Sequence, residues 1–543
     1  MKKFLSMILA LALILSLSVT AFAEDTTLSI TDEGDRDYAG YKLLNLSTSL
    51  KNDNLHVPHD GEEHNPDCYN YAYTVNPAYR TILQEEAFAN GRNELWLPGV
   101  KPDTAAGVTD QQILDYLGYQ TSDNGDVYMT MRGVADRIYR AIQAAGIDAE
   151  RDDLTGDNDA IEQGYWLFAD ITDLQNENQA NSLVMVDTKG QDKLTITSKT
   201  ALPTVEKKVK DIEDSEDANI ADNAWHDSAD HDIGDAVPFK LTGTLPSNAQ
   251  YYTSFTMIFH DSLSAGLTFD AGSVKVLMYD TKHKADVDTD LNDFAKDVTA
   301  FFTVETTGLE ENCSFEVGCD NVFAIEGVTK DTAFVVYYEA ELNNAAVFGA
   351  AGNPNEVYME YSNDPYSDST GNTEIDKVVV FTYKLVVNKV DAQNRALEGA
   401  GFTLSKKNQD GTYTVIGEEL KGTGMTTFTW PGLDDGDYLL EESTTPEGYN
   451  TMNDIAFSIS AVHSETDGNP VLVTLDGGLM GVGEVIDGVL TGAIVKDIVN
   501  YTGTVLPETG AQGTFMLIFG GTLLVIVAAV FMITRKKMSV YED

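Results

Sequence analysis

Three polar residues in the middle of the chain align with apolar side chains on predicted β-strands. Side chains on a strand alternate between its two faces. By this rule Lys207 shares a face with two valines, Asp261 with two phenylalanines and a methionine, and Asn363 with a valine, a methionine and a tyrosine. Burying a lysine or an aspartate is costly unless the group has a partner. We therefore expect these three residues to meet in one core, with Lys208 as a rival that the alternation turns outward.

The same combination of residue types recurs towards the C-terminus. Lys389 aligns with a leucine and a valine, Glu442 with a tyrosine and a leucine, and Asn500 with two isoleucines, although Lys496 interrupts that last face. In both regions the lysine belongs to the first strand and the asparagine to the last. The repetition predicts a second buried cluster.

Burial would make such clusters reactive. Desolvation lowers the pKa of a lysine and raises the pKa of a carboxyl group. A neutral amine is a nucleophile, and a protonated carboxyl group can polarise an amide carbonyl. The amine could then attack the asparagine amide, release ammonia and leave an isopeptide bond. Alternation alone favours the alternative, which is a hydrogen-bonded cluster without a covalent bond.

The elements that must position these residues are mostly strands. From about residue 200 the pattern is one of short strands separated by turn signals such as residues 408–411, which is typical of β-sandwiches. The region before it mixes strands with helix. Residues 131–147 carry apolar side chains at four-residue spacing, which predicts an amphipathic helix, and residues 164–168 return to a strand.

The N-terminus has the features of a secretory signal peptide. Two lysines precede an apolar run that extends to about residue 19, and small residues follow at positions 21 and 23. We expect residues 1–23 to be removed on export, so that the chain begins outside the membrane.

Near the C-terminus stands the pentapeptide Leu506-Pro507-Glu508-Thr509-Gly510. An uncharged, mostly apolar run follows over residues 515–533, long enough to cross a bilayer as a helix. Three basic residues come next, which places the end of the chain in the cytoplasm.

This order of pentapeptide, apolar span and basic tail resembles the cell-wall sorting signal of Gram-positive surface proteins. The resemblance implies that a sortase cuts between Thr509 and Gly510 and joins Thr509 to an amine of the peptidoglycan or of another protein. The protein is then expected on the cell surface, anchored to the wall. An ordinary membrane anchor, with the pentapeptide as a linker, is the alternative.

Further stretches resemble one family. Residues 438–449, YLLEESTTPEGY, resemble the E-box of Gram-positive pilins, and residues 397–404 resemble the second strand of a Cna-B-type domain. Residues 261–269 and 360–365 resemble the middle domain of the same proteins. The chain thus resembles the sortase-assembled backbone pilins, which implies a mainly β protein of tandem Ig-like β-sandwich domains of Cna-A and Cna-B type, with some helix in the N-terminal domain.

The resemblance also implies domain limits and site residues. The two isopeptide bonds that it implies, assisted by Asp261 and Glu442 respectively, are Lys207 to Asn363 and Lys389 to Asn500. The expected segments are the signal peptide (1–23), an N-terminal pilin domain (24–199), a middle Ig-like isopeptide domain (200–383), a C-terminal Cna-B-type isopeptide domain (384–503) and the sorting signal with its transmembrane helix and basic tail (504–543).

A pilus shaft also needs an acceptor amine. Backbone pilins that resemble this chain carry it in a W-x-x-x-V-x-V-Y-P-K motif between the first two domains. The matching stretch here, residues 194–199, ends in Lys199 but lacks the Trp, Tyr and Pro of the motif. Its two apolar residues face one way, so we expect Lys199 on the opposite, solvent-facing side. Lys189 and Lys193 remain alternatives.

Composition excludes several classes of partner. The formal net charge of -52 argues against nucleic acid or an anionic membrane. Only three cysteines are present; Cys313 and Cys319 are close enough in sequence to pair across a short hairpin, which would leave Cys68 unmatched.

Neither metal nor cofactor is expected from the motifs. An acidic stretch beginning at Asp286 alternates like a calcium loop, but Leu291 stands where an EF-hand needs glycine and Asp297 where it needs glutamate. The eight histidines show no zinc spacing, and phosphate-loop, nucleophile-elbow and dinucleotide motifs are missing.

The sequence therefore predicts a structural polymer subunit and not an enzyme. The implied partners are sortase, further copies of the chain and peptidoglycan, with minor pilins and host surface ligands as further candidates. One alternative is a non-polymerised wall-anchored adhesin or minor pilin. A wall-anchored hydrolase would need an acid pair such as Glu441 with Glu442 or Asp434 with Asp435, but adjacent strand residues face opposite ways.

Overall fold

The computed structural model describes residues 21–22, 25–31, 36–50, 69–91, 93–96, 101–119, 131–174, 178–197, 201–212, 225–291, 293–310, 312–464 and 468–503. The predicted signal peptide up to residue 20, Lys199, and the sorting signal from residue 504 onward lie outside these residues. The chain forms two compact units, a larger one made of residues up to 212, 222–382 and 463–473, and a smaller one made of the remainder.

The first part of the larger unit combines two sheets. Its strands are β1 (Ala21–Phe22), β2 (Asp25–Thr31), β3 (Tyr38–Leu50), β4 (Tyr69–Val75), β5 (Arg151–Leu154), β6 (Asp159–Glu162), β7 (Gly164–Asp170), β8 (Leu183–Asp187) and β9 (Lys193–Thr197). One sheet has the order β1-β3-β7-β8, with β4 and β5 also paired to β3, and the other has the order β6-β2-β9. The strand predicted at residues 164–168 is β7.

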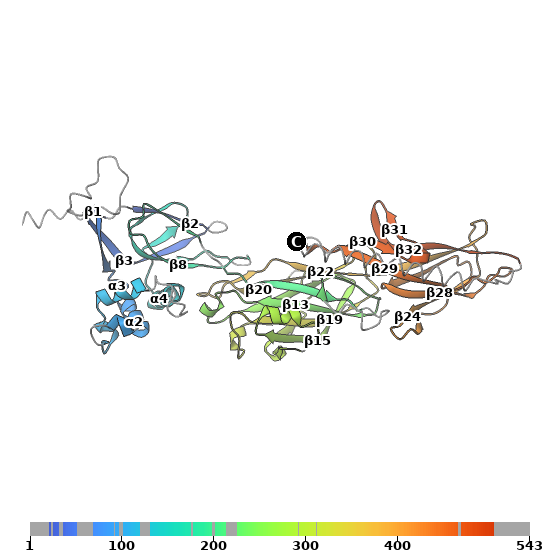
Figure 1. The fold of residues 1–543 in the computed structure, drawn as a ribbon, viewed down its shortest axis with the longest axis horizontal. Coiled ribbons are helices and arrows are strands. Elements are labelled where there is room, and N and C mark those ends of the chain that lie inside the picture. The colour runs from blue at the N-terminus through green and yellow to red at the C-terminus, as the bar shows by residue number, and fades with distance from the viewer. Residues whose placement is uncertain are drawn as a thin grey trace, which may run out of the picture. The chain divides into compact units, whose positions relative to one another are not determined.

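Helices are concentrated beside the first of these sheets (Figure 1). They are α2 (Arg80–Asn90), α3 (Asp110–Tyr119) and α4 (Met131–Ala145). The helix α4 is the one that the four-residue spacing predicts, and it buries Val134, Ile138 and Ile142 in a core shared with the sheet.

The second part of the larger unit is a β-sandwich. Its elements are β10 (Val205–Lys210), β11 (Trp225–His226), β12 (Ser228–Asp230), β13 (Ala236–Thr244), β14 (Met257–Leu263), β15 (Leu267–Tyr279), α5 (Lys282–Val287), β16 (Lys296–Asp297), β17 (Thr303–Glu305), β18 (Phe315–Cys319), β19 (Ala333–Leu342), β20 (Asn353–Ser362), β21 (Thr370–Asn372) and β22 (Asp376–Phe381). A six-stranded sheet has the order β11-β10-β13-β19-β15-β16, and a seven-stranded sheet has the order β12-β22-β20-β14-β18-β17, with β21 paired to β20.

Apolar side chains from both sheets fill the centre of this sandwich. Phe239 and Tyr338 come from the six-stranded sheet, and Phe259 and Phe315 from the seven-stranded sheet. This core contains none of the residues of the core around α4, although Tyr366 packs against the latter. Smaller cores form around Trp166 and Phe168 in the first part and around Tyr279 in the second. The domain limits expected from the sequence stay predictions.

The smaller unit is a second pair of sheets. Its strands are β23 (Tyr383–Asp391), β24 (Gly401–Lys407), β25 (Tyr413–Val415), β26 (Leu420–Lys421), β27 (Thr427–Leu433), β28 (Gly436–Thr444), β29 (Ile455–Ser464), β30 (Val471–Asp476), β31 (Gly483–Ile486) and β32 (Val489–Asn500). The end of β29 and the start of β30 fall within residues 463–473, which are grouped with the larger unit. One sheet has the order β27-β23-β32-β31, and the other has the order β25-β24-β28-β29-β30, with β26 paired to β24. The first and last strands, β23 and β32, are parallel neighbours.

The fold is mainly β with its longer helices in the first part, which confirms the predicted fold class. Among the residues that the structure describes, no helix has the length and apolar character needed to cross a membrane. The span predicted over residues 515–533 is outside that set.

Candidate functional site

The first predicted cluster forms in the centre of the middle sandwich. Lys207 comes from β10 in one sheet and Asp261 from β14 in the other, and their side chains form an ion pair with no exposed surface. The hydroxyl group of Tyr338, on β19, lies 3.0 Å from Lys207 Nζ and 3.0 Å from Asp261 Oδ2. One hydroxyl group therefore bridges the amine and the carboxyl group.

The asparagine of this cluster is Asn355. Its Nδ2 donates to the Tyr338 hydroxyl oxygen at 2.7 Å, and the residue is fully buried. Antiparallel pairing of β14 with β20 sets Asp261 opposite Val357 and Leu263 opposite Asn355. Asn355 therefore lies two residues from the position that faces Asp261, on the same face of its strand. Its Oδ1 accepts no hydrogen bond from the described residues.

The prediction that Asn363 belongs to this cluster is wrong. Asn363 is six residues beyond Val357, which corresponds to about 20 Å along an extended strand. Its Nδ2 donates instead to the carbonyl oxygens of Leu174 at 3.0 Å and Thr370 at 3.1 Å. Asn363 thus ties the end of β20 to the first part of the larger unit.

Burial shifts both ionisable partners of the first cluster towards their neutral forms. It lowers the pKa of the Lys207 amine, although Asp261 opposes the shift, and it raises the pKa of the Asp261 carboxyl group, although Lys207 opposes it. It also holds the pKa of Tyr338 well above its usual range, so the hydroxyl group keeps its proton. A neutral amine beside a protonated carboxyl group is the pair that amide attack requires.

The second predicted cluster comes together as a whole in the smaller unit. Lys389 on β23 is opposite Ile498 on the parallel strand β32, and Asn500 follows two residues later on the same face. Glu442 reaches them from β28 in the other sheet, and its two carboxylate oxygens accept from Asn500 Nδ2 at 2.7 and 3.0 Å. Lys389, Glu442 and Asn500 are all buried, and Lys389 Nζ donates to the carbonyl oxygen of Ile498 at 3.0 Å.

The environment of Lys389 also favours a neutral amine. Burial lowers the pKa of Lys389 to about 8, against the opposing charge of Glu442. Asn500 Oδ1 is buried and accepts no hydrogen bond from the described residues. Oxygen and nitrogen of an asparagine amide exchange places on a half-turn of the side chain. That half-turn would place Oδ1, the oxygen of the carbonyl group that the amine attacks, beside the Glu442 carboxyl group.

Sequence reasoning missed two residues of the first cluster. Asn355 has the same strand parity as Val357, Met359 and Tyr361, so extending the alternation backwards would have included it. Tyr338 shares one face of β19 with the buried Val336 and Ala340, and a hydroxyl group on such a face needs a partner inside the core.

The remaining lysines that the sequence singled out lie on the surface or outside the described residues. Lys208 is half-buried and pairs with Asp227, which keeps it out of the core. Lys189 and Lys193 are both exposed, the first in the turn before β9 and the second at the start of that strand. Lys199 is two positions past the end of β9 and is not among the described residues.

The possible disulfide between Cys313 and Cys319 does not form. Both thiols are free, and the two residues flank or end a single strand, β18, instead of facing each other in a hairpin. Cys319 is the last residue of β18 and Cys313 lies two residues before its first, so the strand alone separates them by about 13 Å, whereas the Cα atoms of a disulfide lie about 4–7 Å apart.

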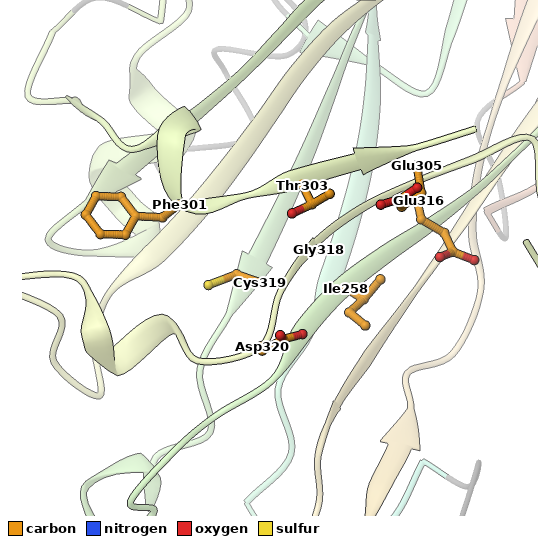
Figure 2. A pocket seen from close by; sticks show the side chains of 8 residues that line it. All are labelled: Ile258, Phe301, Thr303, Glu305, Glu316, Gly318, Cys319 and Asp320. Carbon is orange, nitrogen blue, oxygen red and sulfur yellow. The ribbon is translucent and has the colours of Figure 1, made fainter. Parts of the chain in front are cut away.

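A cavity of about 340 Å³ opens on the outer face of the seven-stranded sheet. Figure 2 shows Glu305 and Glu316 close together at one end of it and Phe301 at the other. Burial raises the pKa of the Cys319 thiol in its lining, which makes that thiol a weak nucleophile. Residues of the two clusters do not line this cavity, so it is separate from their chemistry.

Comparison with protein families identifies two segments of the chain. Residues 383–469 match the SpaA prealbumin-like fold domain, and residues 498–539 match the LPXTG cell wall anchor motif. The first match covers β23 to β29, including Lys389 and Glu442, and the second begins two residues before Asn500. The chain therefore carries a prealbumin-like domain and, further towards the C-terminus, the anchor motif of cell-wall-attached surface proteins.

Individual relatives are similar over larger stretches. The trypsin-resistant surface T6 protein of Streptococcus pyogenes serotype M6 is 26% identical over 282 residues, which are 49% of this chain and 47% of that protein. The chain thus spans about half the length of this curated relative.

Two solved structures are also similar to the chain. The T6 backbone pilin of serotype M6 Streptococcus pyogenes is 17% identical with a TM-score of 0.45, covering 89% of this chain and 99% of that one. The major pilin SpaD from Corynebacterium diphtheriae is 16% identical with a TM-score of 0.39, covering 64% of this chain and 81% of that one. These relatives are structural proteins.

Proposed function

We propose that this chain, a cell-wall-anchored surface protein with a prealbumin-like domain, is the backbone subunit of a sortase-assembled pilus. It serves as a structural polymer subunit and does not turn over a substrate. The observation that supports this most is the second cluster, where Lys389 on the first strand and Asn500 on the last lie side by side with Glu442. This arrangement suits a covalent bond that closes the smaller unit immediately before the sorting signal.

Each cluster forms one isopeptide bond. The neutral lysine Nζ attacks the asparagine Cγ, the carboxyl group donates a proton to the amide oxygen, and a tetrahedral intermediate results. The bond between Cγ and Nδ2 then breaks, and the nitrogen leaves as ammonia with a proton that originates from the amine. As the carbonyl group reforms, the proton on its oxygen returns to the carboxylate. In the first cluster, the contacts of Tyr338 with Lys207, Asp261 and Asn355 support a bond from Lys207 to Asn355.

Sortase joins the subunits to one another. Thr509 becomes the acyl donor after cleavage before Gly510, and Lys199 of the next subunit is the acceptor. Position supports Lys199, because in sequence it falls between β9, which ends at Thr197, and β10, which begins at Val205, and these two strands pack on different cores. Joining one end of a subunit to a different surface of the next gives a filament that does not close. The last subunit is attached to peptidoglycan.

The experiment that tests polymerisation is a denaturing gel of wall extracts from the native host, probed for this chain. The wild type should give a ladder of heat-resistant species, and Lys199→Arg should leave only monomer attached to the wall. Arginine keeps the charge but stays protonated, so it cannot act as the nucleophile. Lys189→Arg and Lys193→Arg are matched controls on exposed lysines near the same strand.

Two results would change this proposal. If the ladder survives Lys199→Arg and disappears with one of the two control variants, the acceptor is that other lysine. If the wild type shows only wall-bound monomer, the chain is a wall-anchored adhesin or minor pilin, a function that the incomplete acceptor motif at residues 194–199 would then explain.

A further inference from the structure

A cluster of metal-ligating side chains lies on the outer face of the seven-stranded sheet. His260 on β14 is next to Asp261 in sequence but points away from the core, and only 3% of its surface is exposed. Its Nδ1 lies 3.1 Å from Glu316 Oε1 on β18, and its Nε2 lies 3.2 Å from Glu360 Oε2 on β20. The imidazole ring is thus held between carboxylates of the two neighbouring strands.

The thiol of Cys313 completes a set of three different donors. A ring nitrogen of His260, the sulfur of Cys313 and a carboxylate oxygen of Glu316 lie within 4.8 Å of one another. Ligand atoms of a tetrahedral zinc ion are about 3.3–3.6 Å apart, given bonds of about 2.0–2.3 Å. Small rotations of the half-buried cysteine and glutamate side chains would close the remaining gap.

The histidine is already oriented for such a role. Tyr358 stacks on its ring with centroids 4.5 Å apart and planes 6° from parallel. Metal-binding histidines generally donate their second ring N–H to a carboxylate, which fixes the tautomer and leaves the other nitrogen for the metal. Glu360 at Nε2 is that carboxylate, so Nδ1 remains as the ligand atom towards Cys313 and Glu316.

Charge at this place also favours a cation. Glu305 on β17 is the direct cross-strand partner of Glu316, and like charges in that position repel each other. Both glutamates line the cavity on the same face, which gives an ion access and leaves room for a water molecule (Figure 2).

We propose that His260 Nδ1, Cys313 Sγ and a carboxylate oxygen of Glu316 bind a divalent metal ion, with zinc as the best fit. Imidazole, thiolate and carboxylate are all zinc ligands, and a water molecule takes the fourth position. His260 and Cys313 are 53 residues apart in sequence, so the three ligands do not form a short sequence motif. A bound ion would fasten the loop before β18 to β14 and stabilise the folded chain, because only the folded chain presents the site.

The test is a cobalt titration of the mature chain, residues 24–509, in a Cys68→Ser/Cys319→Ser background that leaves Cys313 as the one cysteine. One equivalent of Co²⁺ should bind and produce a thiolate-to-cobalt charge-transfer band, which Zn²⁺ should displace. Adding Cys313→Ser should abolish the band, and Glu360→Gln should weaken Zn²⁺ binding about 10- to 100-fold. Zn²⁺ should also raise the melting temperature of this background but not that of the same chain with His260→Gln.

Absence of saturable binding, or binding that is unchanged by Cys313→Ser, would overturn the site. In that case His260 is a histidine bridging two glutamates and nothing more. If Cys313→Ser fails to fold, Glu316→Gln is used in its place, and this variant should bind Co²⁺ and Zn²⁺ more weakly than the background if the site is real. Neither the metal titration nor the melting temperature depends on polymerisation or on the isopeptide bonds. The metal site and the proposed function can therefore fail independently.

Discussion

Lys207 and Asp261 belong to opposite sheets of the middle sandwich, yet their side chains meet as an ion pair in which neither has any exposed surface. Two isolated charges at such a place would be costly, and pairing offsets this cost only in part. Conversion of the amine to an amide would remove the problem permanently. Formation of the proposed bond would thus remove the cost of burying these two charges.

Intact mass counts the bonds directly. The mature chain should weigh less than its calculated mass by two molecules of ammonia, one for each bond. Glu442→Ala should restore one ammonia and Asp261→Ala the other, because each removes the carboxyl group that polarises an amide. A wild-type chain at its full calculated mass would show that neither bond forms.

The identity of the first asparagine is decided by a pair of variants. Asn355→Ala should raise the mass by one ammonia relative to wild type, after correction for the substitution, because Asn355 is the asparagine that is hydrogen-bonded to Tyr338. Asn363→Ala should leave both bonds intact and cost only about 1–3 kcal/mol of stability, since it loses hydrogen bonds to Leu174 and Thr370. The opposite pattern in mass spectrometry would restore Asn363 as the reacting residue.

The hydroxyl group of Tyr338 should matter for the rate of the first bond. Tyr338→Phe keeps the ring and removes the one group that contacts amine, carboxyl and amide together. Freshly purified Tyr338→Phe should be a mixture of species that differ by one ammonia, whereas the second bond should be complete. The matched control is Tyr337→Phe, whose hydroxyl group bonds Glu339 on the other face of the strand. Full bond formation in Tyr338→Phe would show that the hydroxyl group is dispensable.

Stability of the smaller unit should depend on pH when its bond cannot form. In Asn500→Ala, Lys389 stays free to titrate, with a pKa that burial lowers to about 8 in the folded state, while an unfolded lysine titrates near about 10.4. Between these values the unfolded chain binds more protons, so the free energy of unfolding should rise with pH, by about 3 kcal/mol in all. Below about pH 8 the folded state carries the full cost of the buried charge.

Denaturant unfolding from about pH 7 to about pH 10 measures this rise. Other groups titrate in the same range, so the double variant Asn500→Ala/Lys389→Met serves as the reference. The difference between the two profiles isolates Lys389. A difference that stays flat with pH would contradict a lowered pKa at this position.

The two clusters differ in how much of them strand alternation could predict. In the smaller unit Lys389 and Asn500 lie on neighbouring parallel strands, so knowing the face of each was enough to bring them together. In the middle sandwich Asn353, Asn355 and Asn363 all have the same parity, and only the register of β20 against β14 distinguishes them. Register is a property of long-range pairing and is not written in the local pattern.

Other features were beyond local patterns for the same reason. Cys313 and Cys319 are close in sequence, but β18 lies between Cys313 and its own last residue Cys319, so nearness in sequence did not mean nearness in space. The cluster around His260 joins three strands and a loop, and its residues are unremarkable one by one. The acceptor role of Lys199 stays a prediction.

The position of Asn355 also determines how the middle sandwich would respond to tension along a filament. From Asn355 the chain still runs through β21 and β22 before it leaves the sandwich at Thr382. A pull at Thr382 would reach the proposed Lys207–Asn355 bond only after β22 has separated from β20 and β12, and residues 356–362 from β14. Because β22 is antiparallel to β20, with Val380 opposite Asn353, this pull opens the pair from its end, one hydrogen bond at a time.

Once these strands have separated, residues 356–382 would form an extended tether of about 90 Å, and the covalent bond would then stop the extension. In the smaller unit Asn500, the residue proposed to form the bond, is the last residue of the last strand, so almost no chain would be released on that side. One subunit would therefore combine an inextensible module next to the wall anchor with a module that absorbs a sudden pull and recovers its length when β22 pairs again.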